Sequence, residues 1–354
     1  MRILIIKTSA LGDIVQTYPL LSYLKERFPE GIVDWVVEGR MSELVTTHSQ
    51  IDKVISIDTR RIRKKIFSYA IWKEIFSFRK NLRSRTYDIT FDVQGNCKSG
   101  LILWMTKSSV KVGFGRKNCT EWPALLFSNK RFNVPKQANI RDDYVNIARC
   151  YFQDDKPYFA PSILLNWKDK TEVFDCKILE KNQKMRVMIC PGSLWSNKQL
   201  TVDALYEFLK CMDKKFAPYF LFVWGCKKEQ EIAFCLHESF LETSTVVDKM
   251  PLPALQNLMD KMDLVISMDS LPLHLAATTK AKTFAFFGAS SKAKYAPIGK
   301  KHGSIQGECP YERIFEKRCP ILRTCSTGAC IHDLNGRKLF NQFLSWWSIS
   351  STSV

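Results

Sequence analysis

One aspartate in this sequence lies where an apolar run passes into a helical pattern, a position suited to acid–base chemistry. It ends the segment KTSALGD, residues 7–13, which follows the apolar run at residues 3–6. Small residues let a ligand approach the backbone, and a helix start offers free N–H groups. Asp13 therefore either stabilises the start of the helix or takes the proton of a substrate hydroxyl. Its position leaves both roles open.

Three polar turns in the second half of the chain have the same setting, each between an apolar run and a helical pattern. They are Pro191–Lys198, Gly225–Glu229 and Met268–His274. Because the carboxyl ends of parallel strands share one edge of a sheet, we expect the three turns to converge on one cleft. Taken singly, His274 also fits a buried structural histidine, and Asp269 and Ser270 also fit helix caps. Their recurrence at three strand ends favours a ligand site.

Common nucleotide-binding fingerprints are incomplete. Gly113-Phe114-Gly115 lacks the third glycine of a dinucleotide loop, and the chain has no G-x-x-x-x-G-K-[ST] and no D-x-D sequence. Dehydrogenase and P-loop chemistry are thus disfavoured. An enzyme that handles a pyrophosphate without a metal must neutralise it with helix N-termini, hydroxyls, lysine and histidine.

Positive charge is concentrated in one part of the chain. Of a net charge of +18, residues 51–141 carry +14, from 20 Lys and Arg against 6 Asp and Glu. This region favours an anionic partner, which can be nucleic acid, a membrane surface or a phosphorylated substrate. A solvated basic face is the plain alternative. The tightest run is Arg60, Arg61, Arg63, Lys64 and Lys65.

Strand-like and helical patterns alternate along all 354 residues, which predicts an α/β protein of two doubly wound domains. The predicted strands are Arg2–Lys7, Val33–Val37, Ile89–Val93, Arg186–Cys190, Tyr219–Trp224, Leu264–Ser267 and Thr283–Phe287. A proline-containing polar stretch at 156–182 predicts the interdomain boundary. No apolar run reaches the roughly 20 residues of a membrane span, and the opening run is too short for a signal peptide. We therefore expect a cytoplasmic protein.

Two features near the C-terminus each allow two interpretations. Four of the twelve cysteines, Cys309, Cys319, Cys325 and Cys330, cluster without C-x-x-C spacing, which favours loop packing over a structural metal or disulfide. The helix predicted at 337–349 has a wide apolar face with Trp346 and Trp347 near one end. It is either a packing helix or a site of interfacial membrane contact.

Several segments resemble bacterial lipopolysaccharide heptosyltransferases, which form glycosyltransferase family 9. The resemblance rests on the opening MRILIIKTSALGDIVQTYPLLSYLKERFP and on DVQGNCKS, VWGCKKE, SMDSLPLHLAA and FFGASS, in this order across nearly the whole chain. The KTSxxGD start, DWVVE and the basic RRIRK run are most similar to members that add the first heptose.

The resemblance implies a GT-B architecture, in which two Rossmann-like domains face each other across a cleft. It places an acceptor-binding domain at 1–165, a nucleotide-sugar-binding domain at 166–335, and a C-terminal helix at 336–354 that packs on the N-terminal domain or contacts a membrane. The implied reaction is inverting, metal-independent transfer of heptose from ADP-heptose to the Kdo-bearing inner core of lipid A. No cofactor is implied. The expected enzyme is a monomer at the cytoplasmic face of the inner membrane, with no nucleic-acid partner.

The resemblance also assigns roles to individual residues. Asp13 matches the general base. The implied donor-binding residues are Ser193, Lys198, Glu229, Asp269, Ser270 and His274. The implied acceptor-binding residues are Ser9, Gly12, Arg60, Arg61, Arg63, Lys64 and Gln94.

Two positions depart from the family pattern. Leu271 replaces the usual glycine after Asp269-Ser270, although Pro272 suits a first helical turn, and Leu200 replaces a frequent tryptophan. These departures keep open the transfer of a second heptose or of another nucleotide-linked sugar. A non-catalytic protein that binds nucleic acid or an anionic membrane on a transferase scaffold is the alternative from another class.

Overall fold

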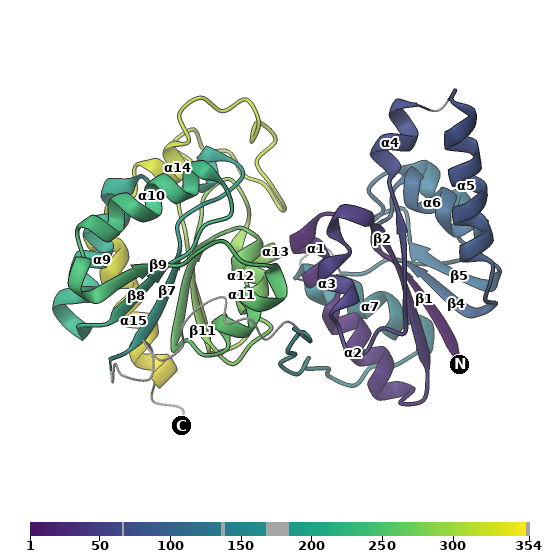
Figure 1. Cartoon of the computed structure of the whole chain (residues 1–354), viewed down its shortest axis with the longest axis horizontal. Helices are drawn as coiled ribbons and strands as arrows, with labels where there is room; N and C mark the ends of the chain where they lie inside the picture. Colours follow the sequence, from purple (N-terminus) through teal and green to yellow (C-terminus); the bar gives the residue numbers. More distant parts are fainter. Residues whose placement is uncertain (66, 136–138, 168–183, 352–354) are drawn as a thin grey trace. The chain divides into compact units, whose positions relative to one another are not determined.

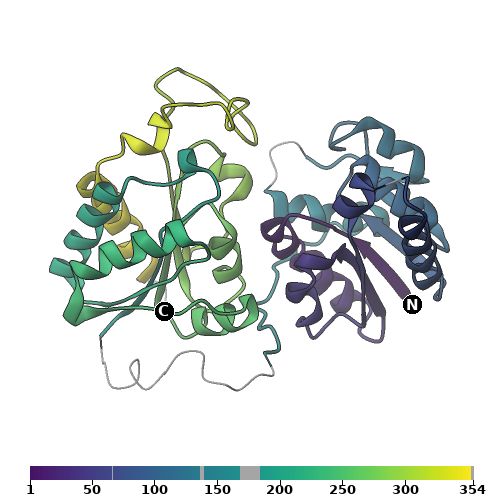
Figure 2. The ribbon, with the colours of Figure 1, turned by 45° about the horizontal axis from the view of Figure 1, so that its top comes forward.

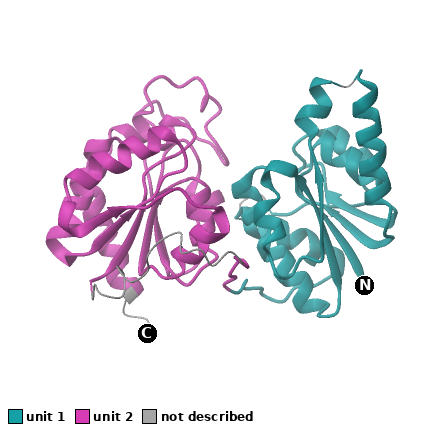
Figure 3. Cartoon of the chain, viewed as in Figure 1, with its two compact units in different colours: residues 1–161 teal, residues 162–354 magenta. Residues whose placement is uncertain are grey.

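The computed structural model describes residues 1–65, 67–135, 139–167 and 184–351 (Figure 1). The chain divides into two compact units, residues 1–161 and 162–354 (Figure 3). Each unit contains a six-stranded sheet in which every pair of neighbouring strands is parallel. The predicted fold class, two Rossmann-like α/β domains, is confirmed.

The sheet of unit 1 has the order β3-β2-β1-β4-β5-β6. Its strands are β1 (Arg2–Ile6), β2 (Ile32–Glu38), β3 (Lys53–Ile57), β4 (Tyr87–Asp92), β5 (Ser108–Phe114) and β6 (Lys130–Phe132). In the centre, β1 pairs with β2 on one side and β4 on the other, and all of β1 after Arg2 is buried. An apolar run such as ILII suits a strand covered on both faces.

Helices cover both faces of this sheet. They are α1 (Leu11–Val15), α2 (Tyr18–Arg27), α3 (Glu43–Thr46), α4 (Thr59–Lys64), α5 (Tyr69–Leu82), α6 (Cys97–Met105) and α7 (Ile140–Phe152), with 3₁₀ turns η1 (Gly39–Met41) and η2 (Trp122–Phe127). Helices α2 and α7 pack together on one face, and α5 and α6 cover the other (Figures 1 and 2).

The helical segment after β1 is two helices in the structure. Helix α1 ends at Val15, and α2 starts anew at Tyr18, with Thr17 as N-cap and Pro19 in its first turn. Pro19 has no N–H to continue a helix from the preceding residues, so the chain re-initiates there.

Unit 2 repeats the topology of unit 1, with the order β12-β11-β10-β7-β8-β9. Its strands are β7 (Arg186–Cys190), β8 (Tyr219–Phe222), β9 (Ser244–Val246), β10 (Leu264–Met268), β11 (Lys282–Phe287) and β12 (His302–Gln306). Its helices are α9 (Val202–Phe216), α10 (Lys227–Glu238), α11 (Leu252–Met259), α12 (Leu271–Ala276), α13 (Lys292–Tyr295), α14 (Ala329–His332) and α15 (Gly336–Ser351), with η3 (Ser196–Lys198) and η4 (Leu241–Thr243).

The units divide after residue 161, whereas the sequence placed the domain boundary after 165. Residues 163–165 belong to unit 2 because their backbone is bonded to it. The amide of Leu165 donates to the side-chain oxygen of Gln256 on α11 at 3.1 Å, and the amide of Ile163 donates to the carbonyl of Thr278 at 2.7 Å. Most of the predicted interdomain stretch, residues 168–183, lies outside the described residues.

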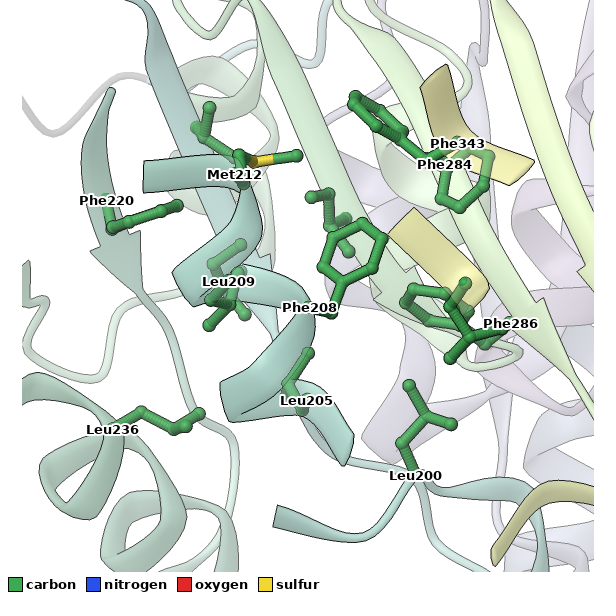
Figure 4. Packing of buried hydrophobic residues seen from close by; sticks show 14 of the residues in the cluster. Leu200, Leu205, Phe208, Leu209, Met212, Phe220, Leu236, Phe284, Phe286 and Phe343 are labelled. Atoms are coloured by element: carbon green, nitrogen blue, oxygen red, sulfur yellow. The ribbon is translucent and has the colours of Figure 1, made fainter. Parts of the chain in front are cut away.

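The last helix packs on its own unit. The sequence led us to expect α15 on the N-terminal domain or at a membrane, but it lies against α9 and β12, as α7 lies against α2 in unit 1. Phe343 is fully buried, with ring centroids 5.0 Å from Phe284 and 5.7 Å from Phe208 (Figure 4). Trp347 stacks on Phe343 at 5.6 Å. The apolar face of α15 thus completes the core of unit 2.

Among the described residues, no helix is long and apolar enough to cross a bilayer.

Replacement of Phe343 by alanine tests the role of α15. We expect Phe343→Ala to lower the free energy of unfolding by about 3–5 kcal/mol, because it leaves a cavity among packed aromatic rings. Urea unfolding followed by circular dichroism measures the change. Ile349→Ala on the same helix is the control, since that side chain is 66% exposed. Equal effects of the two substitutions would contradict the packing role.

Candidate active site

The loop after β1 holds the candidate base. Asp13 is half-buried in the first turns of α1, and its carboxylate accepts the backbone N–H of Ala10 at 3.2 Å. Gly12 precedes it on the same helix, and both are partly exposed. The carboxylate therefore caps the helix and also reaches solvent at the carboxyl end of the sheet. The two roles that the sequence left open are compatible.

Gln94 ties this loop to the end of the neighbouring strand β4. Its side-chain oxygen accepts the backbone N–H groups of Thr8 at 3.1 Å and of Ser9 at 3.2 Å. Two predicted acceptor residues, Ser9 and Gln94, are thus joined directly. The Gln94 oxygen is engaged in holding the loop.

A buried carboxylate, Asp92, lies next to Gln94 at the end of β4. Asp92 ends β4 and accepts hydrogen bonds from the N–H groups of Gln94 and Gly95 and from the hydroxyl of Ser99, at 3.0, 3.1 and 2.8 Å. Burial raises the pKa of Asp92, and these hydrogen bonds and the charge of Lys7 oppose the rise only in part. Lys7 is itself buried and donates to the hydroxyl of Tyr144 at 2.9 Å. Lys7 lies in the segment KTSALGD and Asp92 in DVQGNCKS, but neither residue was predicted to have a role.

The basic run predicted for the acceptor forms α4, which follows β3. Arg60, Arg61, Arg63 and Lys64 are all exposed. Asp58 caps the helix by accepting the N–H of Arg61 at 2.9 Å. Arg61 also lies 3.6 Å from Glu74 of α5, so the cluster is connected to the next helix. Four exposed cations on this short helix give the surface a concentrated positive charge, which solvent and salt screen.

In unit 2, three of the predicted donor residues meet in a buried cluster. Asp269 directly follows β10, and its carboxylate lies 2.5 Å from the ammonium of Lys198 on η3 and 3.7 Å from the imidazole of His274 on α12. Ser290, in the loop after β11, donates its hydroxyl to the same carboxylate. All four side chains are buried.

The charges in this cluster control its protonation. Burial alone would raise the pKa of Asp269, but His274 and Lys198 outweigh it and hold the pKa well below its usual range. Asp269 is therefore a carboxylate at neutral pH. Lys198 and His274 are thus held in fixed positions beside this carboxylate, and such preorganised donors can contact a negatively charged ligand.

Sequence reasoning missed Ser290. Its signal is present, since FFGASS places a small-residue loop after a strand as the other three turns do. Its role becomes visible only when β11 is placed beside β10.

Glu229 belongs to a second contact group. It lies in the first turn of α10, accepts the N–H of Gly225 at 2.7 Å, and packs on Gly192 of the β7–η3 loop. A Cβ at position 192 would overlap this carboxylate. Ser193 follows Gly192 in the same loop and is half-buried. A side chain at position 192 would therefore displace the Glu229 carboxylate from this turn.

The first turn of α12 contains the departure from the family pattern. Ser270 is the N-cap, and its hydroxyl donates to the carbonyl of Met268 at 3.3 Å, while Leu271 and Pro272 begin the helix. The proline allows the helix to start despite the missing glycine. At the other departure, Leu200 is buried in the core of unit 2 (Figure 4), and Trp195 lies under Arg323 with 5.7 Å between the guanidinium carbon and the ring centroid.

The four clustered cysteines line one narrow cavity beside the site. Cys309, Cys319, Cys325 and Cys330 are free thiols there. The amide of Cys319 donates to the carbonyl of Ala289 at 2.8 Å, and Asn197 donates to the carbonyl of Leu322. The loop therefore packs against the residues next to Lys198 and Ser290. In the described part of the chain, no three His, Cys, Asp or Glu side chains are placed to hold a metal ion.

Comparison with known proteins extends these observations. Residues 75–324 match the family described as glycosyltransferase family 9 (heptosyltransferase). Lipopolysaccharide heptosyltransferase 1 of Escherichia coli K12 is 26% identical over 300 residues, covering 85% of this chain and 92% of the relative. The Campylobacter coli protein of the same name is 29% identical over 309 residues, covering 84% and 86%.

Solved structures agree on the fold. The structure of E. coli heptosyltransferase WaaC with ADP-2-deoxy-2-fluoro heptose has a TM-score of 0.73 to this chain at 23% identity, covering 98% of this chain and 99% of the other.

Neutralising Asp269 tests the buried cluster. We expect Asp269→Asn to lower the free energy of unfolding at pH 7 by about 3–5 kcal/mol, because it leaves Lys198 buried without its counter-ion. The double variant with Lys198→Met should recover part of the loss. Urea unfolding across a pH series measures both. As a control, Glu74→Gln removes the more exposed pair with Arg61 and should cost at most about 1 kcal/mol.

The same series tests the pKa of Asp269. Because the folded pKa is depressed, this carboxylate stabilises the protein fully above its unfolded pKa of about 3.9, and the contribution is lost as the pH falls toward the folded pKa. The difference between wild type and Asp269→Asn should therefore shrink as the pH falls below about 4. A difference that grows below this pH would contradict this assignment.

Proposed function

The chain belongs to glycosyltransferase family 9, and from this membership we propose that it transfers heptose from ADP-heptose to the Kdo-bearing inner core of lipid A, with inversion and without a metal. The observation that carries the proposal is the buried group of Lys198, Asp269 and His274 at the end of β10. Such a group suits the diphosphate of a nucleotide sugar. The relatives named heptosyltransferase 1, and the one solved with an ADP-heptose analogue, support this donor and acceptor.

In the proposed reaction, Asp13 takes the proton of the acceptor hydroxyl while that oxygen attacks the anomeric carbon of the heptose. The bond from this carbon to the phosphate oxygen breaks on the opposite face, and ADP leaves with an additional negative charge. Lys198 and His274 then stabilise the charge that develops on the leaving group more than they stabilise the ground state.

The remaining residues bind the two substrates. Glu229, held by Gly225, binds the nucleoside, and the start of α12 at Ser270, with Ser193, contacts the donor. Arg60, Arg61, Arg63 and Lys64 bind carboxylates and phosphates of the acceptor. Ser9, Gly12 and Gln94 shape the acceptor side of the loop that carries Asp13.

The proposal places the enzyme at the cytoplasmic face of the inner membrane, because its acceptor is a lipid in an anionic bilayer. It also takes the enzyme to be a monomer. A second-heptose transferase, or one for another nucleotide-linked sugar, is the second candidate. Leu271 favours it, since a leucine replaces the family glycine at the start of α12, where the donor is expected.

ADP release from ADP-heptose, measured with and without Kdo-lipid A in buffer containing chelator, tests the function. Acceptor-dependent release in chelator supports the donor, the acceptor and metal independence together. Saturable ADP binding without turnover would select the second candidate. Absence of both turnover and nucleotide binding, with binding to generic DNA or RNA that weakens with salt, would replace the transferase by a nucleic-acid-binding protein.

Asp13→Asn tests the base. Asparagine keeps an oxygen that accepts the N–H of Ala10, so the helix start persists while the base is removed. We expect kcat to fall by about 10²- to 10⁴-fold, with an unchanged Kd for ADP. Initial-rate kinetics and calorimetric titration measure the two quantities. A near wild-type rate would assign the base to another residue.

Glu229→Gln and Gly192→Ala test the nucleoside contact from two sides. The first removes the charge, and the second displaces the carboxylate by filling its space. We expect both to raise the Kd for ADP by at least about tenfold, equivalent to about 1.4 kcal/mol. Glu231→Gln, on the same helix, is the matched control. Unchanged ADP binding in both variants would remove Glu229 from the donor site.

A further inference from the structure

Helix α5 carries aromatic side chains on the face that points away from the protein. Ile71, Phe78 and Leu82 form its buried stripe against the sheet. The opposite stripe is Tyr69, Trp72 and Phe76, at spacings of three and four residues, and these side chains are 85%, 48% and 63% exposed. Helical geometry places the two stripes on opposite sides. A soluble surface helix normally has polar residues where these aromatics lie.

Cations flank the aromatic stripe. Lys73, Arg79 and Lys80 are exposed on the same side of α5. Between residues 59 and 85, the chain has ten Lys and Arg and a single acidic residue, Glu74. The outer face of α5 is therefore both aromatic and strongly basic.

The surrounding surface extends this pattern. Phe67, just before α5, is 99% exposed. Helix α6 packs into the same core cluster as α5 and exposes Trp104, and η2, which contacts α6, exposes Trp122 and Leu126. In Figure 1, α4 and α5 project together at one end of unit 1. The exposed aromatics of α5 therefore lie on a helix at this end of the unit.

We propose that the outer face of α5, led by Phe67, Tyr69, Trp72 and Phe76, docks on an anionic lipid surface. Tryptophan and tyrosine prefer the membrane–water interface, and lysine and arginine are attracted to anionic headgroups. The charge of the face is complementary to such a bilayer. Its aromatic stripe also provides apolar area for shallow insertion.

Docking of α5 on a membrane would also position helix α4. Arg61 of α4 pairs with Glu74 of α5, so docking of α5 brings the cations of α4 to the level of the headgroups. A phosphorylated glycolipid would then meet Arg60, Arg63 and Lys64 without leaving the bilayer. This use rests on the proposed function, whereas the lipid contact has a readout of its own.

Single-stranded nucleic acid also combines cations with stacking aromatics. Such sites are grooves that follow the backbone, with the bases stacked along a platform. The aromatics of α5 instead lie along the exposed face of a helix, and not in a groove. Such a face can insert its side chains into the interfacial region of a bilayer. The lipid assignment is therefore favoured.

Sedimentation of the full chain with phosphatidylcholine vesicles, with and without phosphatidylglycerol, tests the proposal. We expect binding that requires phosphatidylglycerol, weakens with salt, and falls at least tenfold in Trp72→Ser/Phe76→Ser. Lys73→Gln/Arg79→Gln/Lys80→Gln should weaken binding to phosphatidylglycerol vesicles. Phe234→Ser, an equally exposed aromatic on α10 of unit 2, is the matched control and should bind as the wild type does. Brominated lipid should quench a part of the tryptophan emission that Trp72→Phe lacks.

The outcomes that overturn the proposal are distinct. They are absent binding, equal binding to neutral vesicles, or equal loss in Phe234→Ser. A concentration-dependent dimer that Trp72→Ser/Phe76→Ser abolishes would assign the face to a second copy of the chain. Binding of single-stranded DNA by the wild type that the same double variant loses would assign the face to nucleic acid. Turnover of a deacylated, water-soluble acceptor separates the hypotheses. It should persist in the α5 variants, and its absence in the wild type would refute the proposed function and leave the lipid contact standing.

Discussion

Burial of the central strands on both faces is the constraint on which the rest of this structure depends. Strands such as β1 and β10 are covered by helices on either side, so their interior positions are almost entirely apolar. Most polar side chains that can contact a ligand then lie where the strands end. With all strands parallel in each sheet, those ends lie at one edge, and the polar turns of each unit collect there.

The two units have the same sheet topology, but the pKa values of their buried carboxylates shift in opposite directions. In each unit a carboxylate ends the strand that pairs with the first strand, and a buried lysine follows that first strand. In unit 1, Asp92 has its pKa raised because burial dominates over the hydrogen bonds that it accepts. In unit 2, Asp269 has its pKa lowered because Lys198 and His274 dominate over burial. Both carboxylates are buried, so the pairing of Asp269 with Lys198 and His274 separates the two.

Much of this architecture could be predicted because apolar runs mark the central strands. All seven predicted strands are present as central strands or their neighbours. The strands that were not predicted, β3, β5, β6, β9 and β12, are short or half-exposed, and their mixed patterns resemble loops. The placement of α15 was open for a related reason, since an apolar face with two tryptophans fits both a core and a membrane surface. Only the aromatic rings of β11 and α9 decide it.

The residues of the candidate site also differ in whether the sequence alone could identify them. Asp13, Lys198, Asp269 and His274 could be chosen because each follows a strand in a recognisable segment. Ser290 and Gly192 could not, because their importance lies in what they contact from another part of the chain. A sequence gives the types of residues at strand ends, but it does not give which ends are neighbours in the sheet.

Exposed and buried cations suit different tasks in a transferase. The cations of α4 and α5 are exposed, so solvent and salt weaken each ionic contact that they can make. Lys198 and His274 are buried and held by Asp269, so their orientation is fixed before any ligand arrives. Stabilisation of charge that develops during a reaction requires such preorganisation. The chain therefore has exposed, screened cations on α4 and α5 of unit 1 and cations of fixed orientation beside Asp269 in unit 2.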